Sequence, residues 1–458
     1  MPDFSIHSGA RTVLSVATFF AEMKQRAAAL VAAQQVEHRG YFTPSEEDNL
    51  RGLQISYWQA RAALLELAHA FHRQQAAMTA DERRAAFIVA YAAVVLLVDA
   101  ARFLRELVHA RPTIRAKLNE PAAEFGIPRD AYETVQRSLT SPWHAWHLYH
   151  ALAYLRENRD ELSAVAREAG LADVWQIIER LGHRLDVEAT RFVTARVRAR
   201  SRQAARALRY DLAGRALFGI HKVVGMMMAD VYVRPKHHPG LPPPIYQELR
   251  TRLQPGDVLV VRKEYALTNY FLPGFWPHAA LYLGEPRELA ELGLDRHANV
   301  APRWLRIELE EQGERSRVLE AMKDGVLVRS LASPLKSDSV VVLRPLLPRD
   351  QIATALARGL AHEGKSYDFD FDFSRSDRIV CTEVVYRAYQ GVGGIEFPLI
   401  RRAGRQTLGG RELVQMGIAH QFFTPAAVYS PKHSPAILYD EASRDLLERV
   451  DGETPIAG

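Results

Sequence analysis

Residues 374–389 read SRSDRIVCTEVVYRAY and contain Cys381, the single cysteine in the sequence of 458 residues. Apolar residues recur after it at helical spacing, at Val384, Val385, Ala388 and Tyr389. This spacing predicts a helix with one buried face that begins at or just after the cysteine. At a helix N-terminus, free N–H groups and the positive end of the helix dipole favour thiolate over thiol. A lone cysteine is also commonly a small core residue, so its role depends on other residues.

The composition and charge are those of a globular protein. Of the residues, 48% are hydrophobic and 25% are charged. A chain of this length is expected to form two or more domains, because single cores stop growing at about 250–300 residues. One cysteine excludes an internal disulfide framework. The net charge of +5 permits an anionic partner without requiring one, and no nucleic-acid partner is expected.

Neither the N-terminus nor the longest apolar run predicts a membrane segment. The first residues, MPDFSIH, lack the basic lead and apolar stretch of a signal peptide. The apolar run at residues 85–98 is shorter than the about 20 residues that span a bilayer, so it predicts a buried helix. We therefore expect a cytoplasmic protein, with peripheral membrane association or non-classical export as alternatives.

Residues 1–234 predict an all-α domain of unknown role. They are rich in Ala, Leu, Arg and Glu, and capping-box patterns at residues 43–46 (TPSE) and 79–82 (TADE) mark helix starts. Four arginines fall at three- and four-residue spacing, at Arg198, Arg202, Arg206 and Arg209. Such a basic face suits an anionic membrane surface or a protein partner, and it also suits a solvated helix surface.

The proline-rich stretch at residues 235–244 (PKHHPGLPPP) predicts a stiff, extended linker. Beyond it, short β-type runs occur at residues 257–261, 279–283, 317–321, 325–329 and 340–343, followed by a helical pattern at 349–362. The sequence therefore predicts an α+β fold class: a helical domain (1–234), the linker (235–244), an α+β domain (245–433) and a peripheral C-terminal tail (434–458).

Three residue types in this second half form a candidate catalytic group. His278 opens one predicted strand, Glu320 lies within another apolar run, and Cys381 lies at the predicted helix start. A thiolate nucleophile needs a base within hydrogen-bond reach, and the base needs a third group that fixes its orientation. A buried glutamate on a strand is costly unless it is paired, and His278 is its natural partner.

Five segments carry a resemblance to a known family. They are LQPGDVL (253–259), WPHAALYLG (276–284), VLEA (318–321), GKSYDFDF (364–371) and VCTEVVY (380–386). In content and order they resemble the circularly permuted NlpC-type cysteine hydrolases, in particular the YiiX-like branch, over about residues 245–430. The resemblance implies a permuted papain-like domain in which the histidine strand and the third polar residue precede the nucleophile.

The resemblance also implies roles for single residues. Cys381 would be the nucleophile, His278 the base and Glu320 the orienting residue, and Tyr367 would lie near the oxyanion or the substrate. The segment between His278 and Glu320 is long, so Glu308 and Glu310 remain competitors for the third position. No cofactor and no metal is expected.

The predicted chemistry is acyl transfer through a thioester, followed by hydrolysis. On family grounds the substrate would be a peptide-type amide. An aromatic stretch before His278, which includes Phe275 and Trp276, is predicted to lie beside the cleft, where it would hold an acyl chain or pack a loop. The alternatives are a lipid acyl hydrolase or acyltransferase (phospholipase-like) that acts on an ester at a membrane surface, and a non-catalytic scaffold.

Overall fold

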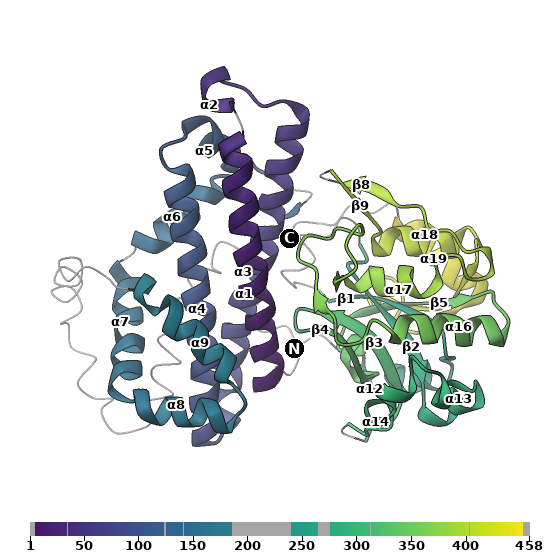
Figure 1. Cartoon of the computed structure of the whole chain (residues 1–458). Coiled ribbons are helices and arrows are strands. Elements are labelled where there is room, and N and C mark those ends of the chain that lie inside the picture. Colours follow the sequence, from purple (N-terminus) through teal and green to yellow (C-terminus); the bar gives the residue numbers. More distant parts are fainter. Residues whose placement is uncertain are drawn as a thin grey trace. The chain divides into compact units, whose positions relative to one another are not determined.

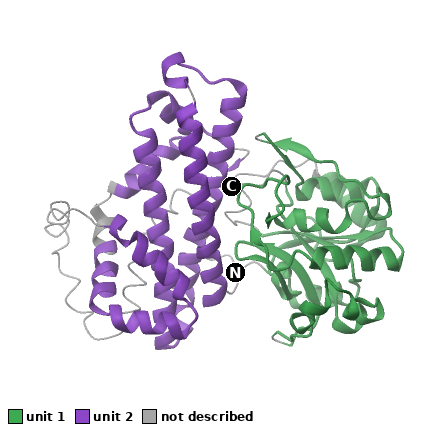
Figure 2. Cartoon of the chain, viewed as in Figure 1, with its two compact units in different colours: residues 1–2, 234–458 green, residues 3–233 purple. Residues whose placement is uncertain are grey.

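The computed structural model forms two compact units, one made by residues 3–233 and the other mainly by residues 234–458 (Figure 2). It describes residues 5–33, 35–122, 125–140, 142–185, 240–263, 275–311, 313–402 and 404–451. Within the range 140–147 the side chains are not described. The arginine face predicted at residues 198–209 lies outside the described residues, as does the first half of the predicted linker, residues 235–239.

The first unit consists of helices in the part of the chain that is described (Figure 1). They are α1 (Ile6–Ala33), α2 (Val36–Arg39), α3 (Pro44–Gln74), α4 (Ala80–Val108), α5 (Pro112–Leu118), α6 (Ala131–Thr140), α7 (Pro142–Glu157), α8 (Arg159–Glu168) and α9 (Ala172–Leu181). The long helices α1, α3 and α4 pack against one another. This arrangement confirms the predicted helical region.

Both predicted capping boxes are present. At the start of α3, the Glu46 N–H donates to Thr43 Oγ1 over 3.4 Å, and the Thr43 N–H donates back to Glu46 Oε2 over 2.8 Å. At the start of α4, Thr79 and Glu82 form the same pair of bonds, at 3.3 and 2.7 Å. Each box satisfies two backbone donors that the first helical turn would leave unpaired.

Helix α4 contains the apolar run at residues 85–98. Among the described residues it is the one helix long and apolar enough to cross a membrane, with a mean hydropathy of 2.1 in its most apolar window. In the structure 83% of that window is buried, and α4 packs against α1, α3, α6, α8 and α9. It is placed as the core helix of this unit.

The second unit contains a seven-stranded antiparallel sheet in the order β11-β10-β5-β1-β2-β3-β4. The strands are β1 (Val258–Arg262), β2 (His278–Gly284), β3 (Arg317–Met322), β4 (Gly325–Ser330), β5 (Ser339–Pro345), β10 (Phe423–Tyr429) and β11 (Leu438–Tyr439). Two short pairs lie outside this sheet, β6 (Ser366–Tyr367) with β7 (Arg378–Ile379), and β8 (Ile400–Arg402) with β9 (Arg405–Thr407). The unit is α+β, as predicted.

Alternate residues of the central strands enter separate hydrophobic clusters. On β1, Val258 and Val260 join one cluster, whereas Leu259 and Val261 join the other. The first cluster includes residues of α16 (Arg349–Leu360), α17 (Cys381–Tyr389), α18 (Gly410–Ile418) and α19 (Asp440–Asp451), and the second includes residues of α12 (Pro243–Arg250) and α15 (Ala332–Leu335). Both faces of the sheet are therefore covered, which explains why β1 is apolar at nearly every position.

The segment between β2 and β3 forms short helices: α13 (Pro286–Glu291), η6 (Leu294–Arg296), η7 (Ala301–Arg303) and α14 (Trp304–Ile307). Its apolar residues Leu289, Leu294 and Ile307 are buried in the first cluster.

Two elements, α12 and β10, differ from the sequence prediction. Helix α12 begins at Pro243, inside the predicted linker, because proline is tolerated in a first helical turn. Strand β10 was not predicted, because Pro425 and a bulge before Ala427 interrupt its pattern.

Candidate active site

Helix α17 begins at Cys381, as predicted. The short strand β7 ends at Ile379, so the chain turns from strand to helix at the cysteine. The predicted apolar face, formed by Val384, Val385, Ala388 and Tyr389, is fully buried. This face packs on β2 and β3, which are the strands that carry His278 and Glu320. Burial of one helix face therefore brings the thiol to the histidine strand.

The register of β2 and β3 brings the histidine and the glutamate together. Leu281 pairs with Leu319, so Glu320 lies two positions along the ladder from His278 and on the same face. The Nε2 atom of His278 lies 2.7 Å from Oε1 of Glu320. With Nε2 occupied in this way, Nδ1 is the ring nitrogen left for the thiol.

Glu320 is 1% exposed and has two further partners. The Ser333 hydroxyl donates to Oε2 over 2.5 Å, and Nε of Arg329 lies 3.6 Å from the same oxygen. Burial alone would raise the pKa of Glu320, but the hydrogen bond and charge of His278, with Arg329 and Ser333, lower it to about 2. The carboxylate is therefore ionised at neutral pH.

His278 and Cys381 shift each other's ionisation. Burial would lower the pKa of His278, but the Cys381 thiolate and the Glu320 carboxylate raise it to about 9. Burial would also raise the pKa of Cys381, yet the His278 charge and hydrogen bond, together with the backbone N–H groups of Ala279 and Thr382, lower it. The two shifts reinforce each other and favour a thiolate–imidazolium pair over a neutral thiol and imidazole, beside an ionised glutamate.

The two partners differ in how open they are to solvent. Cys381 is 1% exposed, whereas the His278 side chain is 23% exposed.

Two contacts hold α18 beside the site. Thr382 donates its hydroxyl to the Leu408 carbonyl over 2.6 Å, which ties the start of α17 to the segment before α18. At the start of α18, a Cβ on Gly410 would come 2.2 Å from the Trp276 carbonyl oxygen. Only glycine permits this close approach beside the histidine strand.

The structure places Phe275 and Trp276 in the same hydrophobic cluster as Cys381. They are 8% and 2% exposed, and their rings meet edge to face with centroids 4.9 Å apart. Arg262 donates from Nη1 to the Phe275 carbonyl over 2.8 Å and lies over its ring. Such burial favours packing behind His278 over direct contact with a substrate. The preceding aromatic residues, 270 and 271, lie outside the described residues.

Tyr367 lies on β6, which runs parallel to β7 and pairs Tyr367 with Ile379. It is therefore held beside the backbone two residues before Cys381. Its half-buried ring contacts those of Phe369 and Phe371, at centroid distances of 5.1 and 6.2 Å. Tyr367 therefore stays a candidate for the place near the oxyanion or the substrate that the resemblance implies.

Neither competitor for the third position lies beside the histidine. Glu308 ends α14 and accepts a hydrogen bond from Trp304 Nε1 at 2.9 Å. Glu310 pairs with Arg315 at 2.8 Å. Both are exposed, and the segment at residues 306–310 is not a strand. Of the three glutamates, the structure pairs only Glu320 with His278.

A buried acidic group that the sequence did not reveal supports the start of α17. Glu383 is fully buried, accepts the Val380 N–H over 3.4 Å and pairs with Arg387 at 2.7 Å. Burial raises the pKa of Glu383 to about 7 and that of Asp368 to about 6. A neighbouring carboxylate adds to the rise in each case, Asp368 for Glu383 and Asp370 for Asp368. Arg387 also donates to the Arg375 carbonyl over 2.6 Å. It thereby ties α17 to the loop before the cysteine.

Glu320 shows two supports that sequence reasoning missed, Ser333 and Arg329. Arg329 lies within a predicted strand, yet its partnership depends on the pairing of β3 with β4, which no local pattern reveals. Ser333 lies on α15, whose four residues give too short a signal to predict. Among the described residues, no group of three or more His, Cys, Asp or Glu side chains is placed to hold a metal ion.

Comparison with known families agrees with this geometry. Residues 252–435, which are 184 of the 458 residues, match the family described as permuted papain-like amidase enzyme, YaeF/YiiX, C92 family. The match confirms the resemblance inferred from the sequence and covers β1 to the end of β10, including His278, Glu320 and Cys381. No curated protein and no solved structure matches the chain. At a coarse level, the family supports a cysteine hydrolase of the amidase kind that acts on an amide.

Proposed function

We propose that the second unit hydrolyses a peptide-type amide through a thioester on Cys381. The observation that supports this most strongly is the pairing of His278 with Glu320 at 2.7 Å, next to a thiol whose pKa is lowered by the same histidine. A structural cysteine in an apolar core would have its pKa raised by burial. The arrangement matches the need of thiol catalysis for a nucleophile, a base and a group that orients the base.

In the first step, Sγ of Cys381 attacks the amide carbonyl carbon, and a C–S bond forms while the carbonyl oxygen takes the negative charge. His278 Nδ1–H gives its proton to the leaving nitrogen as the C–N bond breaks. The amine leaves and a thioester remains. Backbone N–H groups at the start of α17 would stabilise the oxyanion, and Tyr367 is our candidate for a side-chain donor there.

In the second step, the now neutral His278 accepts a proton from water, and the resulting hydroxide attacks the thioester carbonyl. The C–S bond breaks, the carboxylic acid product leaves, and the thiolate–imidazolium pair is restored. Glu320 accepts no proton in this cycle, since its pKa of about 2 keeps it ionised. It holds the ring orientation and stabilises the imidazolium.

Two alternatives, a lipid-ester hydrolase and a non-catalytic scaffold, receive less support from the structure. The lipid-ester alternative depended on an acyl-binding entrance made by Phe271, Leu272, Phe275 and Trp276. Phe275 and Trp276 are buried in the core, and residues 271 and 272 lie outside the described residues. The scaffold reading requires that the three residues be unrelated, but they lie together and are electrostatically coupled. An amide hydrolase is therefore the function that we favour.

Trapping of the acyl-enzyme tests this proposal. The protein is incubated with a library of short N-acylated peptide amides, quenched in acid and analysed by intact mass and peptide mapping. We expect a hydroxylamine-sensitive acyl adduct on the peptide that contains Cys381. A parallel incubation with phospholipid vesicles distinguishes the lipid alternative. A fatty-acyl adduct formed only from phospholipid would contradict the proposed amide substrate. Cys381→Ala is the control, and it should form no adduct.

A further inference from the structure

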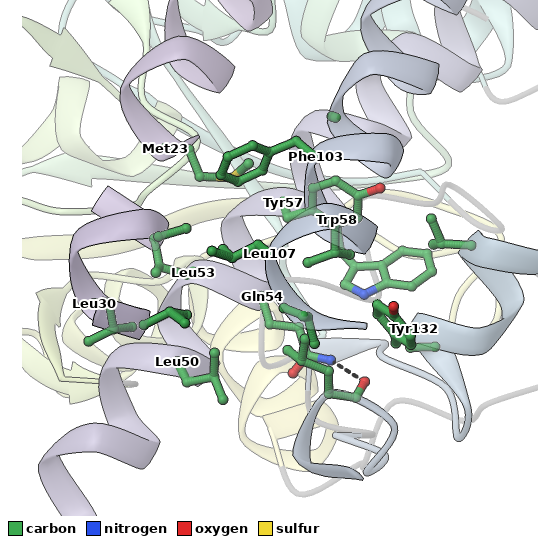
Figure 3. A pocket seen from close by; sticks show the side chains of 18 residues that line it. Met23, Leu30, Leu50, Leu53, Gln54, Tyr57, Trp58, Phe103, Leu107 and Tyr132 are labelled. Carbon is green, nitrogen blue, oxygen red and sulfur yellow. Dashed lines mark hydrogen bonds between the residues drawn. The ribbon is translucent and has the colours of Figure 1, made fainter. Parts of the chain in front are cut away.

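The helical unit contains an apolar pocket that the proposed hydrolase does not use (Figure 3). It lies among α1, α3, α4, α5 and α6, and it encloses about 680 Å³ of empty space, counting the part open to solvent. Its walls carry side chains such as Met23, Leu30, Leu53, Phe103 and Leu107. Apolar pockets between the helices of a bundle are typical of sites for apolar ligands.

The pocket is elongated along the helices that line it. Its wall on α3 runs from Leu50 to Trp58, roughly 12 Å at 1.5 Å per residue. Ala27, Leu30, Phe103 and Leu107 are only half-buried, so the opening lies between α1 and α4. An elongated apolar pocket suits a hydrocarbon chain better than a compact ring system.

Polar groups are few in the wall, and two of them lack partners. The hydroxyls of Tyr57 and Tyr132 are buried and make no hydrogen bond to the described residues, although both side chains line the pocket. Gln54, by contrast, is satisfied, because its Nε2 donates to the Leu118 carbonyl over 2.8 Å. Buried hydroxyls are normally hydrogen-bonded, so Tyr132 is available to a ligand oxygen, and the Tyr57 hydroxyl, which lies close to the Arg61 side chain, can still donate its proton to one.

A buried cation lies beside one of these hydroxyls. Arg61 follows Tyr57 by one helical turn, is 3% exposed, and lies over the Trp58 ring at 5.8 Å. Its Nε has no hydrogen-bond partner, and no carboxylate in the described part of the chain forms an ion pair with it. Its charge acts on the Tyr57 hydroxyl. Arg61 does not itself line the pocket, but a buried arginine is normally paired, so the region next to the Tyr57 hydroxyl is complementary to an anion.

We propose that this pocket binds a fatty acid, with the hydrocarbon chain among the apolar side chains and the carboxylate at the Tyr57 end, beside Arg61. The apolar wall accounts for the chain, and the unpaired guanidinium accounts for the carboxylate. The site is independent of Cys381, so it gives the helical unit a ligand-binding role of its own.

Fluorescence titration of the full chain with cis-parinaric acid tests the site, with decanoic acid and 1-decanol as competitors of equal chain length. We expect saturable binding at one site per chain and displacement by decanoic acid about tenfold or more better than by 1-decanol, because the carboxylate forms charge-assisted hydrogen bonds. The variant Arg61→Met should remove this preference and retain displacement by 1-decanol. The exposed arginine variant Arg167→Met is the matched control and should behave as wild type.

A second variant tests whether the hydrocarbon chain of the ligand lies in this pocket. Ala27→Phe adds a ring at the half-buried opening and should weaken binding of both competitors while its thermal melting stays cooperative. If that variant fails to fold, Leu107→Trp at the same opening replaces it. The proposal is overturned if wild type shows no saturable binding, if the two competitors displace the probe equally, or if a folded variant at the opening binds the probe unchanged.

Discussion

The Nε2 atom of His278 lies 2.7 Å from Oε1 of Glu320, on the strand next to its own. This single contact fixes which ring nitrogen remains for Cys381, and it supplies the negative charge that stabilises the imidazolium. Because Glu320 is itself held by Ser333 and faces Arg329, the orientation of the ring is set by β3, β4 and α15 together. The reactivity of the thiol thus depends on residues that never touch it.

Replacement of Glu320 by Gln should reduce kcat/KM by about 10²-fold without abolishing turnover, because the amide still orients the ring but no longer stabilises its charge. Steady-state kinetics on the amide identified by trapping measures this. Glu308→Gln is the matched control, since Glu308 is exposed and bonded to Trp304. A Glu308→Gln variant as impaired as Glu320→Gln would show that we have assigned the wrong third residue.

Removal of either reacting partner should be far more damaging. We expect Cys381→Ala to eliminate the acyl adduct and turnover. His278→Ala should lower kcat/KM by about 10³-fold or more, because the thiolate loses its stabilising charge and the leaving nitrogen loses its proton donor. Both variants should melt cooperatively, which circular dichroism checks. Full activity in folded His278→Ala would exclude it as the base.

The pH dependence of kcat/KM should be bell-shaped. Activity requires a thiolate and an imidazolium, so it should fall below the lowered pKa of Cys381 and again as pH rises through about 9, where His278 loses its proton. In Glu320→Gln the upper limb should move to lower pH, since the negative partner that raises the pKa of His278 is gone. An upper limb that stays in place in this variant would contradict the electrostatic role of Glu320.

Arg387→Met should destabilise the second unit by about 3 kcal/mol at pH well above 7, because it leaves the ionised Glu383 buried without its cation. The loss should be smaller at acid pH. Glu383 has a folded pKa of about 7, raised from 4.5, so below this value it is protonated and needs no counter-charge. Denaturant unfolding at several pH values measures this. The surface variant Arg444→Met, whose partner Glu448 is exposed, should change stability little.

Much of the second unit follows from local sequence. The buried strand β1, the histidine at the start of β2 and the helix that begins at Cys381 are confirmed because each has a strong local pattern. The division of residues 235–244 stays a prediction, as only their last part is described and it enters α12. Strand β10 was missed because proline and a bulge break its alternation, although it pairs with β5 on one side and β11 on the other.

The sequence predicted the three polar residues of the candidate site but not the residues that support them. His278, Glu320 and Cys381 are unusual residues within apolar runs, so each is visible in isolation. The pairing of Glu383 with Arg387 could not be predicted as buried, because acid–base pairs four residues apart are common on the solvated surfaces of helices. The choice among Glu308, Glu310 and Glu320 needed the strand register, which tertiary pairing sets.

The ionisation of Cys381 tests our central claim most directly. Cys381 is the only cysteine, so the ultraviolet absorbance that wild type shows and Cys381→Ala lacks during a pH titration reports on this thiolate, free of the tyrosine contribution. Absorbance is preferable to alkylation because the thiol is 1% exposed, and alkylation rates would mix access with charge. We predict thiolate absorbance that persists well below the ordinary thiol pKa of about 8.5 in wild type and is lost at neutral pH in His278→Ala. Titration of the wild-type thiol at or above its ordinary pKa, unchanged in His278→Ala, would contradict the account.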